Sequence, residues 1–398
     1  MPVFHPAVPM TDAAVITRNI QQTIMDAHAE YNASGQKRPQ AVVLRANTTY
    51  LLDVLRDASG ESLVRYGGLY KFDRYSLNLP SGVRLIAEDG AVLKYATPPA
   101  ASSFTAIAVA HLSETQITGT PLSVYAATQE TRDVSIEGVT IDLSDLTWQQ
   151  VYDLGGPGAQ CGAINMIKTR NFKVLHNRIN RVWGRFGGTV SCIAGTENGD
   201  FSYNVITGLR QNNQVSGFIF WFDGGRNLRC IENTLAEGMG GIGVYGNHDM
   251  LRDSQAVSLI DNHIARMRGY SIALHGSDCT VLNNVSEQAE GYNHIIVTAS
   301  AWDGFESRRN TISRNRCVNT AYPAPRNQYG VLLTGNLTSG ENEGHFIGHN
   351  TFVGLDTGVM VNNPLAQGST IFANTYENCA RDYFAVPGAE NDVYPAVA

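Results

Sequence analysis

Three ionisable side chains, Asp223, Tyr245 and His275, occupy the same place in three short apolar segments, which read GFIFWFDGG, GIGVYGN and GYSIALHG. Alternate residues of an extended strand face opposite sides, so all three point away from the apolar pair that precedes them. Tyrosine and histidine can act as general bases, and a carboxylate can orient them. The row is therefore a candidate catalytic site, and Glu237 is a second carboxylate that could join it.

Residues suited to holding a substrate surround this row. Trp221 offers a flat apolar face to a sugar ring, and arginines can bind a carboxylate through two hydrogen bonds. The further binding candidates are Trp183, Arg185, Arg226, Arg266, Arg268, His248 and Tyr292. The segment GNHDMLRD, which contains His248, is interpreted as a turn, and no metal site is predicted. The competing interpretation of the whole set is an ordinary solvated surface.

The elements that position these residues are revealed by a repeat. A short apolar strand followed by an asparagine recurs as FKVLHNRI, FSYNVI, LRCIENTL, VSLIDNHI and TVLNNVS, and continues to TIFANTY. Successive asparagines, among them Asn233, Asn262 and Asn284, are 22 to 35 residues apart. That spacing fits the coils of a β-solenoid. We expect the asparagines to stack at one turn and to be structural, so none is a catalytic candidate.

This repeat resembles the right-handed parallel β-helix superfamily, the pectate-lyase-like fold. The resemblance implies an all-β chain in which residues 75–380 form the parallel β-helix. Residues 1–74 are expected to form an N-terminal cap with the first strands, and residues 381–398 a C-terminal tail. Ile16, Ile20 and Ile24 fall on one stripe of a predicted helix over residues 12–31, with Thr11 or Asp12 as its N-cap. This helix should cover the open first coil.

Composition excludes several classes of protein. The 398 residues carry 29 Lys and Arg against 36 Asp and Glu, a net charge of -7, and no basic run. A nucleic acid or an anionic membrane is therefore not the expected partner, and no apolar stretch is long enough to span a bilayer. The six cysteines are scattered without a C-x-x-C pair, and are expected to be buried thiols. The first residues show no secretory signal; an extracellular or phage-associated protein is favoured.

The resemblance implies polysaccharide processing, because lyases, C5-epimerases, hydrolases, fructotransferases and phage tailspikes share this scaffold. In the first hypothesis, a lyase or C5-epimerase acts on a uronate-containing glycan, with Tyr245 or His275 removing the C5 proton and an arginine neutralising the substrate carboxylate. In the second, a glycoside hydrolase or fructotransferase uses Asp223 and Glu237 as a carboxylate pair. In the third, a non-catalytic spike only binds glycan.

Several signatures of the superfamily are absent. We find no pectate-lyase calcium motif, no GHG and no contiguous YGFDPHE-type string. The resemblance therefore does not select one activity. No cofactor is expected, and calcium has no support in the motifs. An oligosaccharide or polysaccharide is the expected partner, and a homotrimer is an assembly known in the superfamily.

Overall fold

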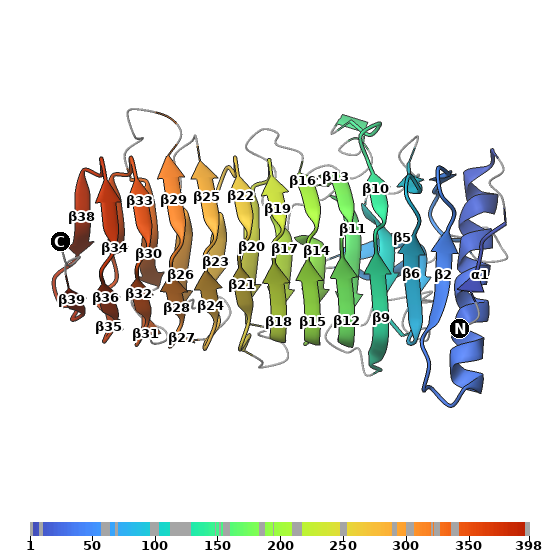
Figure 1. Ribbon diagram of the computed structural model, residues 1–398, viewed down its shortest axis with the longest axis horizontal. Coiled ribbons are helices and arrows are strands. Elements are labelled where there is room, and N and C mark those ends of the chain that lie inside the picture. Colours follow the sequence, from blue (N-terminus) through green and yellow to red (C-terminus); the bar gives the residue numbers. More distant parts are fainter. Residues whose placement is uncertain are drawn as a thin grey trace. The chain divides into compact units, whose positions relative to one another are not determined.

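The computed structural model describes residues 3–7, 11–56, 64–67, 71–95, 103–111, 129–147, 149–150, 153, 160–182, 188–193, 195–208, 217–246, 253–288, 293–299, 306–319, 321, 327–335 and 342–394. Trp183, Arg185, His248 and Tyr292 lie outside these residues. The chain divides into two compact units, Met1–Gly217 (unit 1) and Phe218–Ala398 (unit 2). In both units, short strands joined by tight turns form stacked coils (Figure 1).

Unit 1 begins with α1 (Ala13–Ala33), whose N-cap Asp12 accepts hydrogen bonds from the backbone N–H groups of Ala14 and Val15. The predicted stripe of Ile16, Ile20 and Ile24 is buried, which confirms the predicted helix. The side chain of Gln21 exchanges two hydrogen bonds, of 3.1 and 2.8 Å, with the backbone of Asn78. Beside β2 (Gln40–Leu44) in Figure 1, α1 packs on the first coil as a cap.

Three sheets make up the described part of unit 1, and all their described pairings are parallel except that of β4 with β5. The first contains β1 (Val3–Phe4), β2, β6 (Val83–Ala87), β9 (Thr131–Glu137), β12 (Thr169–Leu175) and β15 (Glu197–Ser202). The second contains β3 (Thr49–Leu51), β7 (Val92–Lys94), β10 (Thr140–Asp142), β13 (Arg178–Val182) and β16 (Val205–Gly208). The third contains β4 (Val64–Gly67), β5 (Lys71–Leu79), β8 (Ser103–Val109), β11 (Gln160–Ile167) and β14 (Gly188–Ile193).

Unit 2 repeats this plan. Its first sheet contains β18 (Arg226–Ile231), β21 (Ser258–Ile260), β24 (Thr280–Leu282), β28 (Thr311–Ser313), β32 (Phe346–Gly348), β36 (Thr370–Phe372) and β39 (Asp392–Tyr394). The second contains β19 (Thr234–Ala236), β22 (His263–Ala265), β25 (Val285–Gln288), β29 (Arg316–Asn319), β33 (Thr351–Val353) and β37 (Thr375–Glu377). The third contains β17 (Phe218–Asp223), β20 (Gly240–Tyr245), β23 (Ile272–Leu274), β26 (Ile295–Ala299), β30 (Tyr329–Gly335), β34 (Thr357–Val361) and β38 (Arg381–Ala385).

A fourth, small sheet of unit 2 pairs β27 (Ser307–Arg308), β31 (Asn342–Glu343) and β35 (Ala366–Gln367). Along the described part of unit 2, consecutive strands enter different sheets, and each pairs in parallel with the strand of a neighbouring coil. This is the predicted parallel β-helix. Strands β38 and β39 pair with β34 and β36, so the coils continue beyond residue 380, into the segment predicted as a tail.

The repeated asparagines are structural, as predicted. In unit 2, the Nδ2 group of Asn262 donates to the carbonyl of Cys230 (2.8 Å) and to Oδ1 of Asn284 (2.9 Å), and all three residues are buried. Asn177 makes the equivalent contact to Asn204 in unit 1, at 3.0 Å. These bonds satisfy backbone groups that each buried turn would otherwise leave unpaired.

The left-handed backbone conformation lies one residue earlier than the asparagine. The residues with φ between 47 and 61° at these turns are His176, Tyr203, Glu232, Asp261, Asn283, Arg314, His349 and Ala373. Each immediately precedes one of the repeated asparagines, which we call the asparagine ladder. The asparagines are therefore selected for their hydrogen bonds and not for tolerance of positive φ.

The cysteines are free thiols, and all are buried except the half-buried Cys379. Burial raises the pKa of Cys279 to about 12, so this thiol stays protonated at neutral pH. Within the described ranges, no cluster of three or more His, Cys, Asp or Glu side chains could hold a metal ion. The helix of the described chain is not long and apolar enough to cross a membrane.

Candidate functional site

The strand register of unit 2 brings the predicted row together. Asp223 at the end of β17 is opposite Tyr245 at the end of β20. Val244 is opposite Leu274, and the backbone N–H of His275 donates to the Val244 carbonyl at 2.7 Å. The three ionisable residues therefore follow one another at the carboxyl ends of β17, β20 and β23. Trp221 is opposite Gly243, in the neighbouring outward column.

The aromatic side chains of this row form a continuous stack. The rings of Trp221 and Tyr245 lie 4.1 Å apart and are nearly parallel, at 14°. The rings of Tyr245 and His275 lie 4.0 Å apart at 35°. Tyr245 is thus held between an indole and an imidazole, which fixes the position of its phenol. We call Trp221, Tyr245 and His275 the ring stack.

The ring stack requires a residue without a side chain at position 243. A Cβ atom at Gly243 would lie 2.7 Å from Cε2 of Tyr245 and 3.0 Å from Cγ of Phe218, so any larger residue would push the rings apart. The space beside Gly243 is therefore filled by aromatic rings. Trp221 is only 7 % exposed, so it supports Tyr245 and is not the open platform that the sequence suggested.

The backbone beneath Tyr245 is fixed by a residue that the sequence did not single out. Ser254 is buried, and its hydroxyl donates to the Tyr245 carbonyl at 2.6 Å while accepting from the N–H of Gly225 at 2.9 Å. The N–H of Gly224 also donates to the Tyr245 carbonyl, at 2.9 Å. These bonds tie the end of β20 to the turn after β17. Ser254 falls outside the repeated strands, so periodicity could not have found it.

Asp223 is the most deeply placed ionisable group of the row, since it is 2 % exposed. Water screens a charge at this depth poorly. Tyr245 and His275 are only half-buried. The arrangement therefore places two groups that can exchange protons at the surface and a carboxylate beneath them.

Glu237 lies at the other end of the strands. It precedes β20, and its carboxylate pairs with Arg266 at 3.0 Å, both side chains being about half exposed to solvent. Strand β20 has six residues, which at about 3.3 Å each separate its two ends by roughly 17 Å. Carboxylate pairs of glycosidases are about 5–9.5 Å apart. The structure therefore does not bring Glu237 to Asp223.

The described arginines divide between the two ends. Arg266 and Arg268 precede β23 and lie at the Glu237 end, where the Arg268 N–H donates to the Gly238 carbonyl at 2.9 Å. Arg226 opens β18, directly after the glycine turn that follows Asp223. It is half-buried. Of these three arginines, Arg226 is the one that the chain places at the end of the strands where the row lies.

Aromatic residues that the sequence analysis missed extend the site. Phe218 lies 5.8 Å, between ring centres, from both Trp221 and Tyr245. Tyr270 and Tyr329 pack, together with Phe218 and Tyr245, against a cluster of outward apolar residues, which are Ala273, Ile296 and Leu332. Burial raises the pKa of Tyr329 above its ordinary value. Phe218 and Tyr329 are the first residues of β17 and β30, and Tyr270 lies just before β23, so aligning the strand starts would have found them. Such faces suit stacking against sugar rings.

Comparisons with known proteins identify the fold. No protein-family model matches the sequence, and no curated protein matches it. Mutants of the tailspike protein of E. coli bacteriophage HK620 are similar in structure. One has a TM-score of 0.68 and 11 % identity, over 97 % of this chain and 62 % of the tailspike. Another, in complex with a pentasaccharide, has a TM-score of 0.66 and 10 % identity, over 94 and 61 %.

The A-module of the mannuronan C-5 epimerase AlgE6 of Azotobacter vinelandii is similar over nearly its whole length. Its TM-score is 0.52 with 14 % identity, over 96 % of this chain and 95 % of the module. This protein therefore has the right-handed parallel β-helix fold of these polysaccharide-processing proteins, as the repeat predicted. The chain spans about three-fifths of the length of the tailspike chains.

Proposed function

We propose that this protein is a lyase or C5-epimerase that acts on a uronate-containing polysaccharide. The observation that carries the proposal is the ring stack, in which Tyr245 contacts Trp221 on one side and His275 on the other, opposite the buried Asp223. A polysaccharide substrate is consistent with the fold, since a structurally similar tailspike binds a pentasaccharide and a similar module belongs to a mannuronan C-5 epimerase.

The proposed reaction starts with removal of the C5 proton of a uronate residue by Tyr245 or His275. The electron pair of the broken C5–H bond is delocalised into the substrate carboxylate, whose charge Arg226 neutralises. In an epimerase, a proton returns to C5 from the opposite face. In a lyase, the C4–O bond breaks, a C4–C5 double bond forms, and the leaving oxygen takes a proton.

Two adjacent groups on one face of the sugar suit a lyase, because one removes the C5 proton and the other supplies a proton to the leaving oxygen, whereas an epimerase needs groups on opposite faces. The Tyr245 and His275 rings lie 4.0 Å apart, which supports the assignment of both groups to the same sugar residue.

The experiment is incubation of the wild type with alginate, pectin and a glycosaminoglycan, followed by mass spectrometry and ultraviolet absorbance of the products. Unsaturated uronides indicate a lyase, and a changed ratio of C5 epimers without shorter chains indicates an epimerase. Either product should disappear in Tyr245→Phe, while Glu237→Gln, at the other end of the strands, should retain activity. A Tyr245→Phe variant with wild-type turnover would reject the assignment.

Glycoside hydrolysis is a second candidate, because Asp223 has another carboxylate in the same part of the fold. Asp253 immediately precedes Ser254, whose hydroxyl joins the ends of β17 and β20. On this alternative, Asp223→Asn and Asp253→Asn both abolish the formation of new reducing ends, and Tyr245→Phe has a small effect. Absence of any product from a bound glycan would instead favour a spike that only binds.

A further inference from the structure

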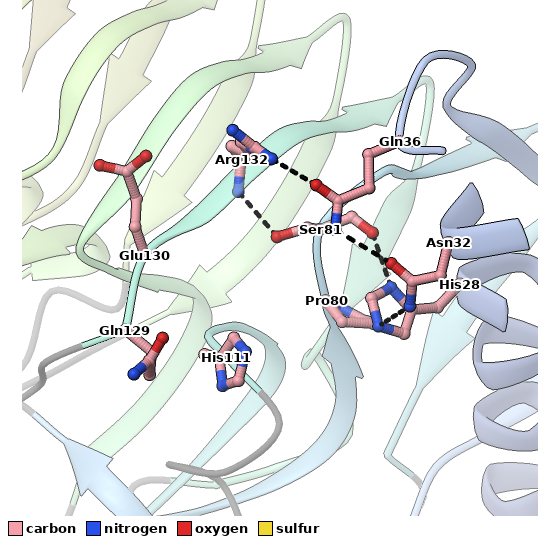
Figure 2. A pocket seen from close by; sticks show the side chains of 9 residues that line it. All are labelled: His28, Asn32, Gln36, Pro80, Ser81, His111, Gln129, Glu130 and Arg132. Atoms are coloured by element: carbon pink, nitrogen blue, oxygen red, sulfur yellow. Dashed lines mark hydrogen bonds between the residues drawn. The ribbon is translucent and has the colours of Figure 1, made fainter. Parts of the chain in front are cut away.

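A polar pocket lies in unit 1, between the end of the capping helix and the first coils. Its volume is about 300 Å³, at the lower end of the range of small-molecule sites. The lining residues are His28, Asn32, Gln36, Pro80, Ser81, His111, Gln129, Glu130 and Arg132. Figure 2 shows the helix residues and Arg132 on one side, with His111, Gln129 and Glu130 across the opening.

One wall of this pocket is a hydrogen-bonded chain that runs in a single direction. Nδ1 of His28 lies 2.8 Å from the Ser81 carbonyl, which can only accept, so Nδ1 carries the proton. Nε2 of the neutral ring then accepts from Nδ2 of Asn32 at 3.0 Å. This order fixes the imidazole tautomer and the orientation of the Asn32 amide.

The same chain continues to a guanidinium group. Oδ1 of Asn32 accepts from Nε2 of Gln36 at 3.4 Å, and Oε1 of Gln36 accepts from Nη2 of Arg132 (Figure 2). The backbone N–H of Arg132 donates to the Ser81 hydroxyl at 3.1 Å. The wall is therefore held in one arrangement before any ligand arrives, which lowers the entropy cost of binding.

The end of the helix positions this wall. Gly35 and Gln36 have φ of 70 and 61°, and the N–H of Gln36 donates to the Tyr31 carbonyl at 3.0 Å. This left-handed turn brings the Gln36 side chain back over Asn32. The turn at Gly82, with φ of 75°, packs directly against the Tyr31 ring, where a Cβ atom would overlap it. Ser81 is thereby fixed against the helix.

The charge of the pocket is balanced. Arg132 is positive, while Glu130, two residues earlier in the chain, is negative and is held by Arg170, with Nε and Oε2 3.5 Å apart. An anion bound to Arg132 would share the pocket with Glu130, and a cation bound to Glu130 would share it with Arg132. Amide, imidazole, guanidinium and carboxylate groups suit neighbouring hydroxyl groups, each of which can donate and accept.

We infer that this pocket is a second, non-catalytic binding site for a neutral sugar residue. Its size admits one hexose, and its polar lining matches a ring with several hydroxyl groups. The inference is independent of the proposed function, because every lining residue belongs to unit 1 whereas the ring stack belongs to unit 2. The sugar can come from a free monosaccharide or from the end of a glycan.

The test is titration of the wild type with glucose, galactose, mannose and fructose, with their methyl glycosides, and with glucuronate and inorganic phosphate, by saturation-transfer NMR. We expect at least one neutral sugar to bind with a dissociation constant of roughly a millimolar. A methyl glycoside that binds as tightly as the free sugar indicates the end of a glycan, and a free sugar that binds more tightly indicates a monosaccharide. Binding of glucuronate or phosphate alone would overturn the inference, as would no binding at all.

Variants connect the binding to this pocket. Asn32→Ala removes the central amide from an exposed helix position and favours the helix, so the fold is kept while affinity falls about tenfold. Glu30→Ala, on the same helix but outside the lining, should leave affinity unchanged. Glu130→Gln should weaken a neutral sugar without creating phosphate binding. Wild-type affinity in Asn32→Ala, or phosphate binding gained by Glu130→Gln, would contradict the inference.

Discussion

The two units share one coil plan but differ on the outer face of one sheet. In unit 1, the outward column of β5, β8, β11 and β14 holds small or polar residues, which are Asn78, Ala108, Asn165 and Ser191. In unit 2, the outward column of β17, β20, β23, β26 and β30 holds Trp221, Gly243, Ala273, Ile296 and Leu332. In unit 1, Ala108 of this column is buried in a cluster with Leu55 and Tyr75, so other residues of the same chain cover it.

The position two residues further along each strand differs as strongly. In unit 1, Ile167 of β11 is opposite Ile193 of β14, whereas in unit 2 the corresponding pair is Asp223 and Tyr245. Inward residues and asparagine ladders are alike in both units, because every coil needs the same core and the same turn. The difference teaches that the repeat specifies the coil, while chemistry can arise at outward positions that the repeat leaves free.

The largest effect on turnover should come from substitutions in the ring stack, where the two units differ. Tyr245→Phe and His275→Ala should each lower turnover on a polyuronate by about 10²–10⁴-fold, the range for a lost acid or base. Ile167→Val is the matched change in unit 1 and should leave turnover unchanged. Steady-state kinetics with thermal melting checks this, and equal losses in all three variants would mean that the effect comes from folding.

The second effect is a pH dependence of the folding stability, which originates in two buried histidines of unit 2. Burial lowers the pKa of His294 to about 3 and of His345 to about 4. The unfolded chain therefore takes up these protons first as the pH falls. The stability contributed is complete above about pH 6.5 and is lost below it, at up to about 1.4 kcal/mol per pH unit for each histidine.

A glutamine variant isolates this effect from the titration of carboxylates. His294→Gln can keep a bond to Ser286, which lies 2.7 Å from Nδ1, but it cannot take up the proton. The difference in unfolding free energy between the wild type and His294→Gln should therefore shrink between pH 7 and pH 5. Denaturant melts at both pH values measure it, and parallel curves would show that His294 is not the titrating group.

A smaller effect, on stability, should come from substitutions in the asparagine ladder, which both units share. Asn262→Ala removes bonds to Cys230 and Asn284 and leaves buried backbone groups unpaired, which should cost about 1–3 kcal/mol. Asn204→Ala in unit 1 should cost a similar amount, and the exposed Asn362→Ala almost nothing. Calorimetry checks the order, and an Asn262→Ala protein as stable as the wild type would refute the structural role.

The smallest effect on stability concerns the residue with positive φ that precedes each asparagine of the ladder. Ala373 has φ of 47° and Asn283 has φ of 55° at equivalent turns. Because asparagine adopts this conformation at lower cost than alanine, Ala373→Asn should stabilise the protein by about 0.5 kcal/mol and Asn283→Ala should destabilise it similarly. Chemical denaturation resolves the pair, and shifts of the same sign would contradict the explanation.

The sequence predicted the fold much better than the site. Asn262 and its equivalents reveal the coils because every turn needs the same hydrogen bonds, and strand alternation then fixes which residues lie opposite one another, including Asp223 and Tyr245. The depth of Trp221 could not be predicted, because it depends on how Phe218 and Tyr245 fill the space beside Gly243. Glu237 was grouped with Asp223 because closeness in sequence concealed the length of β20.

Deuterium incorporation tests the proposed chemistry most directly. Defined polyuronates are incubated with the protein in deuterium oxide, and the sugars are analysed by mass spectrometry and NMR. Proton abstraction predicts deuterium at C5 of the product, or an unsaturated residue that has lost the C5 hydrogen, with both signals absent from Tyr245→Phe. New reducing ends with the C5 hydrogen retained, in the wild type and in Tyr245→Phe alike, would contradict it.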